Sequence, residues 1–208
     1  MLTDTPISLL ERIRLGGDSA SWERLVALYT PLIRGWLGGY GLQPTDVDDL
    51  TQEVLRAAVT ALPQFRRDRP GDSFRGWLWT ITRNKVRDHW RRHADQAKAA
   101  GGTTAQEVMR QVPDDTAPNS EAGAEEESSN LYHRALELIR SEFEERTWRA
   151  FLMVTVEGRL PADAAAELGT TPGAVYIAKC RVIKRLREEF GDLLEDRGVS
   201  HGACRLPR

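Results

Sequence analysis

The chain has few of the features that mark secreted, membrane-inserted or disulfide-stabilised proteins. Its 208 residues include only two cysteines, Cys180 and Cys204, so we expect no disulfide framework and favour a reducing compartment. No apolar run is long enough to cross a bilayer, and the first residues lack the pattern of a signal peptide. These absences predict a cytoplasmic protein without membrane insertion.

Patterns that carry catalysis are equally scarce. The sequence contains no glycine-rich phosphate loop, no Ser/His/Asp constellation and no carboxylate pair placed for acid–base work. His89 and His93 lie four residues apart and could share a metal, but no third ligand follows at a diagnostic spacing. His201 and Cys204 near the C-terminal end supply only half a site. We therefore expect no enzymatic activity, no metal and no cofactor.

Charge is distributed unevenly along the chain, although the formal net charge is only -2. Residues 65–92 hold nine Lys/Arg and three acids (+6), and residues 172–187 hold five Lys/Arg and no acid (+5). Between them, residues 99–130 hold one Arg and seven acids (-6). Two basic blocks separated by an acidic stretch indicate two contacts with a polyanion.

Apolar spacing predicts helices throughout and no strand. We expect helices over 8–15 and 21–38, with Pro31 kinking or dividing the second one. Another should run from Thr45, as its N-cap, to before Pro63, and a fourth should start at Phe74 with Ser73 as cap. Residues 95–129 indicate a flexible, partly disordered linker, and two further helices are expected over 131–145 and 148–156.

The helix from Phe74 to His93 has an apolar face and an opposite face of aromatic and basic residues. On one side lie the apolar residues expected in the core: Phe74, Trp77, Leu78 and Ile81. On the other side lie Trp79, Arg83, Val86, Arg87 and Trp90. Rings interleaved with arginines suit single-stranded nucleic acid, whose bases can stack. Equally, the tryptophans could pack on a neighbouring helix while the arginines stay solvated, and the segment alone leaves both readings open.

Residues 161–187 show the pattern of a helix-turn-helix. A short helix over 162–168 is closed by Gly169, and a longer basic helix starts from Thr171 with Pro172 at its first position. A small internal core is expected from Ala165, Leu168, Val175 and Val182. Any hairpin of two helices with a glycine turn looks similar, but the lack of acids in the second helix favours DNA binding.

Three blocks of the chain together resemble a known family. The blocks are DVDDLTQEVLRAAV from Asp46, FRGWLWTITRNKVRDHWRR from Phe74, and the region from Trp148 to Arg187. They are similar, in this order, to regions 2.2, 2.3–2.4 and 4 of bacterial RNA polymerase sigma factors of the extracytoplasmic-function (ECF) class. The resemblance implies an all-α fold of two small domains, a region 2 helical bundle over 1–95 and a region 4 helix-turn-helix over 130–192. An acidic flexible linker over 96–129 would join them, and 193–208 receives no assignment.

The function implied by this resemblance is that of a transcription initiation factor. Such a factor binds core RNA polymerase, reads the minus-thirty-five duplex and captures the melted minus-ten strand of promoter DNA. An anti-sigma factor is a possible further partner. The residues implied in polymerase binding are Asp46, Asp49, Gln52 and Glu53. Those implied at the minus-ten strand are Arg66, Arg67, Arg69, Trp79, Arg83, Asn84, Arg87, Trp90, Arg91 and Arg92. Those implied at the minus-thirty-five duplex are Thr171, Gly173, Ala174, Tyr176, Lys179, Arg181, Lys184 and Arg185.

Two other functions are considered beside this one. One is a conventional helix-turn-helix regulator of duplex operators, with residues 1–95 as an effector or dimerisation domain. The other is a helical adaptor that binds protein through its aromatic face.

The segment 174–178 (AVYIA) lacks an arginine that the family often has there, so base preference does not carry over from the resemblance.

Overall fold

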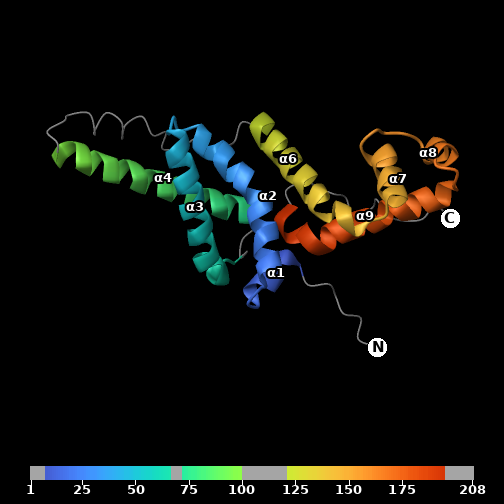
Figure 1. Ribbon diagram of the computed structural model, residues 1–208, viewed down its shortest axis with the longest axis horizontal. Coiled ribbons are helices and arrows are strands. Elements are labelled where there is room, and N and C mark those ends of the chain that lie inside the picture. Colours follow the sequence, from blue (N-terminus) through green and yellow to red (C-terminus); the bar gives the residue numbers. More distant parts are fainter. Residues whose placement is uncertain (1–7, 67–71, 100–120, 195–208) are drawn as a thin grey trace. The chain divides into compact units, whose positions relative to one another are not determined.

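The computed structural model describes residues 8–66, 72–99 and 121–194, and all regular structure in these ranges is helical (Figure 1). The predicted all-α fold is confirmed. The chain divides into two compact units. The central unit comprises residues 19–131, and the terminal unit combines residues 1–18 with residues 132–208. None of the helices in the described part of the chain combines the length and the apolar character that a membrane span requires.

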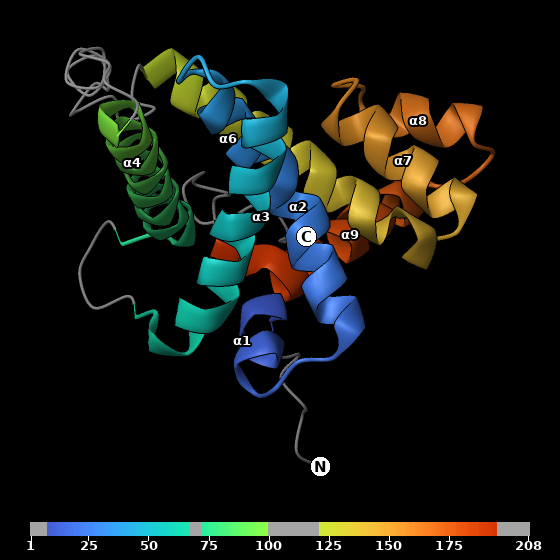
Figure 2. The same cartoon turned by 60° about the vertical axis from the view of Figure 1, so that its left-hand side comes forward.

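The central unit is built from α2 (Ser19–Gly38), α3 (Pro44–Ala61), the 3-10 turn η1 (Leu62–Gln64) and α4 (Phe74–Ala99). Helices α2, α3 and α4 pack against one another (Figure 2). Aromatic rings meet in the core, where Tyr29 contacts Phe74 edge-on with centroids 5.0 Å apart. The fully buried side chains of this unit include Leu28, Tyr29, Ile33, Leu37, Leu50, Leu62, Phe74 and Leu78.

The ends of these helices follow local sequence signals, with one difference from expectation. Of the two outcomes expected at Pro31, division does not occur, since α2 continues through it as one element. Helix α3 begins at Pro44 with Gln43 as its N-cap instead of Thr45, because proline at the first helical position has its φ already set for a helix. Ser73 caps α4 as predicted, and its Oγ accepts a hydrogen bond of 3.0 Å from the Gly76 N–H.

The buried face of α4 differs from the predicted one. The buried positions include Phe74, Leu78, Thr82 and Val86, which follow one another every four residues. Trp77 and Ile81, expected in the core, are only half-buried, whereas Val86, expected on the opposite side, is fully buried. The buried face of α4 is therefore rotated about the helix axis relative to the predicted face.

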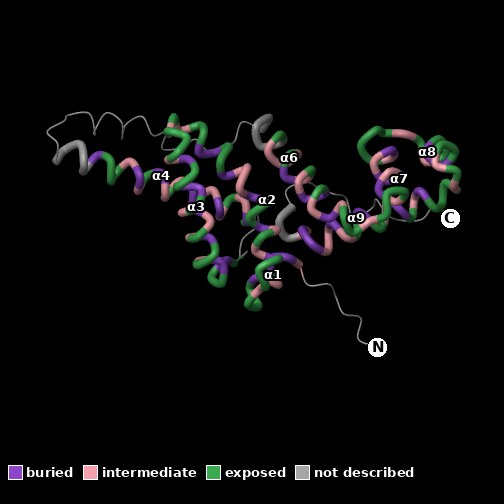
Figure 3. The backbone as a smooth tube through the Cα atoms, in the orientation of Figure 1, coloured by how far each residue is buried: buried purple, intermediate pink, exposed green. Residues whose placement is uncertain are grey.

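The terminal unit joins α1 (Leu9–Arg14) to the C-terminal helices α7 (Glu145–Thr155), α8 (Pro161–Glu167) and α9 (Pro172–Leu194). The helix α6 (Glu121–Ile139) and the 3-10 turn η2 (Arg140–Glu142) precede them. Helices α7 and α8 both pack on α9 (Figure 2). Buried and exposed positions alternate along α9, as expected of a helix with one packed face (Figure 3). The core between α7, α8 and α9 consists of Ala150, Met153, Ala164, Ala165, Val175 and Ala178.

A buried ion pair joins the two ends of the chain within the terminal unit. The Glu189 side chain on α9 has no exposed surface and accepts hydrogen bonds from Arg12 of α1 and from Arg185. Leu9, Leu10 and Ile13 of α1 are buried as well. The sequence led us to group residues 1–95 together, and the structure places α1 with the C-terminal helices instead.

The segment expected to be a linker is partly helical. Helix α4 continues to Ala99, and α6 already starts at Glu121 rather than near residue 131. Residues 100–120 lie outside the described part of the chain. The tail with His201 and Cys204 also lies outside the described residues.

Candidate nucleic-acid interface

The residues of α3 predicted to bind polymerase, Asp46, Asp49, Gln52 and Glu53, form an acidic stripe whose members lie in two different environments. Asp49 and Gln52 are exposed, whereas Asp46 and Glu53 are half-buried against α4. The Glu53 carboxylate lies 3.4 Å from both the Lys85 Nζ and the Arg92 Nη2. Glu53 is thus engaged by basic residues of the same unit, whereas Asp49 and Gln52 are open to solvent.

The charges around Glu53 also change its acidity. Burial by itself would raise the pKa of this carboxyl, but the positive charges and hydrogen bonds of Arg92 and Lys85 outweigh burial and lower it. Glu53 therefore stays ionised to lower pH than an ordinary glutamate. Its charge is balanced inside the unit, so it is less available to an outside partner than Asp49.

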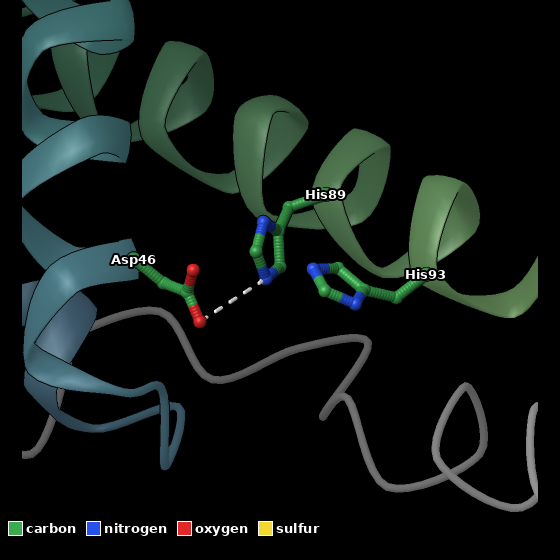
Figure 4. A group of neighbouring side chains, drawn as sticks. All are labelled: Asp46, His89 and His93. Atoms are coloured by element: carbon green, nitrogen blue, oxygen red, sulfur yellow. Dashed lines mark ion pairs between the residues drawn. The ribbon is translucent and has the colours of Figure 1, made fainter. Parts of the chain in front are cut away.

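Asp46 lies next to the two histidines of α4 (Figure 4). The His89 Nε2 is 3.9 Å from the Asp46 Oδ2, and the His89 and His93 rings are 4.3 Å apart between centroids. Burial lowers the pKa of His89, and His93 lowers it further, while Asp46 acts in the opposite direction. The sequence showed the His-x-x-x-His pair, but the third residue comes from a different helix and no spacing could have pointed to it.

The basic residues of α4 are exposed to different degrees. Asn84, Arg87 and Arg91 are exposed. Arg91 pairs with Asp88 at 2.8 Å, and Arg92 turns toward Glu53. An exposed row of one amide and two guanidinium groups on one helix can hold phosphates and meet the edges of bases.

The two tryptophans of the predicted binding face have different surroundings. Trp79 packs against α2, with its ring 5.2 Å from Trp36 in an edge-on contact and 6.3 Å from Tyr40 in a stacked one. Trp90 is half-buried beside His89, with ring centroids 5.4 Å apart. Trp79 thus packs against a neighbouring helix, as the alternative to nucleic-acid binding predicted for this segment. Trp90 has no such aromatic cluster of α2 against it among the described residues.

The loop before α4 is described only in part. Arg66 is exposed, and its Nη1 donates hydrogen bonds to the carbonyl oxygens of Pro63 at 2.8 Å and Phe65 at 3.0 Å. These bonds fold its guanidinium back onto the end of η1. Arg67 and Arg69, also predicted at the minus-ten strand, lie outside the described residues.

The predicted helix-turn-helix is present as α8, a short turn and α9. Gly169 in the turn has a φ of +58°, a conformation that glycine adopts without the steric cost of a side chain. Thr171 caps α9, since its Oγ1 accepts a hydrogen bond of 3.2 Å from the Ala174 N–H. Arg146 of α7 donates to the carbonyl oxygens of Leu168 and Gly169, both at 2.8 Å. Sequence reasoning missed Arg146, because only the fold brings α7 to this turn.

The predicted duplex-binding residues of α9 divide along the helix. Thr171, Gly173 and Ala174 at its start are exposed, as is Arg181 two turns later. Tyr176 and Lys179 are half-buried. The start of this helix therefore presents a nearly bare, small-residue surface that can approach base edges closely.

Farther along α9 the basic residues are paired with acids. Lys184 is exposed and lies 3.6 Å from Glu188. Arg185 is half-buried between Glu142 at 2.5 Å and Glu189 at 2.8 Å. Burial would lower the pKa of Arg185, but these two carboxylates outweigh it and raise the pKa. Arg185 thus helps to hold α9 in its unit, and its charge is compensated there.

Comparison with known proteins finds similarity to one protein family. The sequence model of the family Sigma-70 region 2 matches residues 25–96. The ECF RNA polymerase sigma factor ShbA of Streptomyces griseus is 31% identical over 193 residues, which cover 88% of this chain and 94% of that protein. The ECF RNA polymerase sigma factor EcfG of Rhodopseudomonas palustris is 31% identical over 147 residues, 71% of this chain and 70% of that protein.

A third relative extends the similarity to a further organism. The ECF RNA polymerase sigma factor SigD of Mycobacterium tuberculosis is 29% identical over 189 residues, which cover 85% of this chain and 80% of that protein. Similarity of this extent includes residues of both the central and the terminal unit. The alternative of a conventional operator-binding regulator gains no support from these relatives.

Proposed function

The chain belongs to the family of ECF RNA polymerase sigma factors, which direct RNA polymerase to promoters in transcription initiation, and we propose how its helices divide that work. In this proposal α3 binds core RNA polymerase, α4 captures the melted minus-ten strand, and α9 reads the minus-thirty-five duplex. The chain acts by binding alone and has no catalytic activity of its own. The observation that carries the proposal is the exposed start of α9 in a helix-turn-helix, in a chain similar to ECF sigma factors over most of its length.

Polymerase binding is assigned first to the exposed part of the α3 stripe. Asp49 and Gln52 lie one turn apart on α3 and are exposed, so they can meet a basic partner surface without breaking an internal ion pair. Glu53 is assigned a supporting role, because its carboxylate already binds Lys85 and Arg92. Asp46 lies farther back beside His89 and contributes less in this scheme.

Strand capture is assigned to the exposed face of α4. Arg87 and Arg91 are placed to hold phosphates, and Asn84 to meet a base edge. Trp90 is the aromatic residue of this helix assigned to base stacking, which is worth roughly 1–3 kcal/mol per base. Trp79 instead fixes α4 against Trp36 and Tyr40 and so positions the face.

Duplex reading is assigned to the start of α9. Thr171, Gly173 and Ala174 are exposed there, and the N-terminal residues of a recognition helix are the ones that reach base edges in the major groove. Arg181 is assigned to a phosphate. Lys184 and Arg185, which sequence reasoning also placed on DNA, hold carboxylates of their own unit and are assigned less of the binding.

In vitro transcription with core RNA polymerase on a promoter library tests this function and reads out its sequence preference together. The full chain should co-purify with core polymerase and support initiation from a defined subset of promoters. Asp49→Lys should weaken both activities by charge repulsion. Glu23→Lys, an equal charge change at an exposed position of α2, is the matched control and should leave them intact.

Two results would reject the proposal. One is a chain that does not bind core polymerase at all. The other is transcription that survives Asp49→Lys as well as it survives Glu23→Lys, because the exposed acidic stripe would then have no part in the complex.

A further inference from the structure

Three side chains that can bind a metal meet at one edge of the central unit. Asp46 comes from the first turn of α3, and His89 and His93 come from successive turns of α4. Each offers one ligand atom, and these atoms all lie within 4.8 Å of one another. Figure 4 shows the His89 ring between the Asp46 carboxylate and the His93 ring. A spacing of four residues puts both imidazoles on the same face of α4.

The distance between the Asp46 carboxylate and the His89 imidazole fits two ligands of one ion better than a direct hydrogen bond between the two groups. Asp46 Oδ2 and His89 Nε2 are 3.9 Å apart, beyond the roughly 2.7–3.2 Å of a normal N–H···O hydrogen bond. Two ligands of a tetrahedral ion with bonds of about 2.0–2.1 Å lie roughly 3.3 Å apart. A small rotation of the side chains would therefore close the cluster around an ion.

We propose that Asp46, His89 and His93 form a binding site for a single divalent transition-metal ion, with Zn²⁺ as the fitting example. Two imidazole nitrogens and one carboxylate oxygen form a donor set that suits Zn²⁺ and its neighbours rather than Mg²⁺ or Ca²⁺, which prefer oxygen ligands.

The exposure of the three residues leaves room for a fourth ligand. His89 is buried, Asp46 is half-buried and His93 is exposed, so the cluster opens to solvent on the His93 side. Water can complete a tetrahedral ion there. Three protein ligands and one open position therefore differ from a closed structural site, in which four protein ligands surround the ion.

The surrounding charges permit a cation at this position. Arg92, the residue before His93, is held by Glu53 at 3.4 Å, so its charge is partly compensated. A metal bound to Asp46 and both histidines would link the start of α3 to the fifth and sixth turns of α4. It would thereby fasten the helix that carries the acidic stripe to the helix that carries Asn84 and Arg87.

Isothermal titration of the chelator-treated, full-length chain with ZnCl₂ tests the proposal directly. We expect one Zn²⁺ per chain, and Co²⁺ at the same site should show the visible absorption of a four-coordinate ion. Loss of an outer-shell partner of a metal costs roughly 10–100-fold in affinity, so loss of a direct ligand in His93→Ala or Asp46→Asn should cost at least that much. Mg²⁺ should not compete.

Matched variants separate this cluster from other metal-binding residues of the chain. His133→Ala removes an exposed histidine of α6, and the double change His201→Ala with Cys204→Ser removes the donors of the tail; both should bind Zn²⁺ like the unchanged chain. Far-UV circular dichroism confirms that the variants are folded, and Asp46→Asn keeps the shape of the side chain. Failure of the unchanged chain to bind Zn²⁺ overturns the proposal. Binding that survives both His93→Ala and Asp46→Asn, or that is lost in either control, overturns it as well.

Discussion

Helices α4 and α9 are both basic in sequence, yet they present their charges in different ways. On α4 the exposed residues Asn84, Arg87 and Arg91 follow one another at helical spacing, whereas Lys85 and Arg92 turn back to Glu53 of α3. On α9 the start of the helix is uncharged and exposed, Arg181 is exposed two turns later, and Lys184 and Arg185 meet acids of the same unit. Counting charges along the chain therefore does not say which charges a partner can reach.

This difference matches the two kinds of DNA that we assign to the helices. A single strand offers phosphates and open bases, so a row of guanidinium groups with a ring beside it suits α4. A duplex offers base edges in a groove, so small residues at the start of α9 can approach closely. The paired arginine of α9 then serves to hold the recognition helix in place.

The largest effect is expected from the buried ion pair of α9. Glu189→Ala leaves Arg12 and Arg185 without their shared carboxylate, and removing one partner of a buried pair costs roughly 3–5 kcal/mol. Urea unfolding of the full chain measures this loss. Lys184→Ala, which breaks only an exposed pair on the same helix, should cost less than about 0.5 kcal/mol. Similar costs for the two variants would mean that the Glu189 pair does not hold α1 and α9 together.

The next effect concerns the two tryptophans of α4. Trp79→Ala should cost about 2–3 kcal/mol of stability, somewhat less than a fully buried tryptophan, because Trp79 is half-buried against Trp36 and Tyr40. Trp90→Ala should destabilise the chain less than Trp79→Ala does, and it should reduce promoter opening more. Chemical unfolding and potassium permanganate footprinting measure the two quantities. A Trp79→Ala protein of unchanged stability that cannot open promoters would assign Trp79 to DNA instead.

Some parts of the fold and of the candidate site could be predicted from the sequence, and others could not. The aromatic and basic composition of residues 74–93, the caps at Ser73 and Thr171 and the turn at Gly169 follow from local rules, and they are present in the structure. The contacts of Trp79 with α2 and of Asp46 with α4 depend on how helices pack, which no local pattern encodes. For the same reason, the buried stripe of α4 and the place of α1 differ from expectation.

A smaller effect distinguishes the arginines of α9. Arg181→Ala should lower the salt dependence of duplex binding by about one unit of slope, as expected for the loss of one phosphate contact. Arg185→Lys, which keeps the charge beside Glu142 and Glu189, should leave the slope unchanged. Fluorescence anisotropy of a promoter duplex with holoenzyme over a series of salt concentrations measures both slopes. An unchanged slope in Arg181→Ala would show that Arg181 does not contact DNA.

The smallest effect is the pH dependence that Glu53 contributes to the central unit. Arg92 and Lys85 lower the pKa of Glu53 in the folded chain despite its burial. Its contribution to stability is therefore present above the ordinary glutamate pKa and is lost as pH falls through the lowered value. The stability difference between the unchanged chain and Glu53→Gln should shrink on acidification below about pH 4. Asp49→Asn on the same helix is the control, and a difference independent of pH would contradict this role.

The division of work between α4 and α9 is tested most directly by footprinting one promoter with holoenzymes that carry different variants. DNase I protection reports binding of the duplex, and permanganate reactivity of thymines reports melting of the minus-ten element. We expect a holoenzyme with Arg87→Ala and Trp90→Ala to protect the upstream duplex while leaving the minus-ten thymines unreactive. A holoenzyme with Thr171→Ala and Arg181→Ala should lose the protection of the upstream duplex. Equal loss of protection and melting in both holoenzymes would contradict the account.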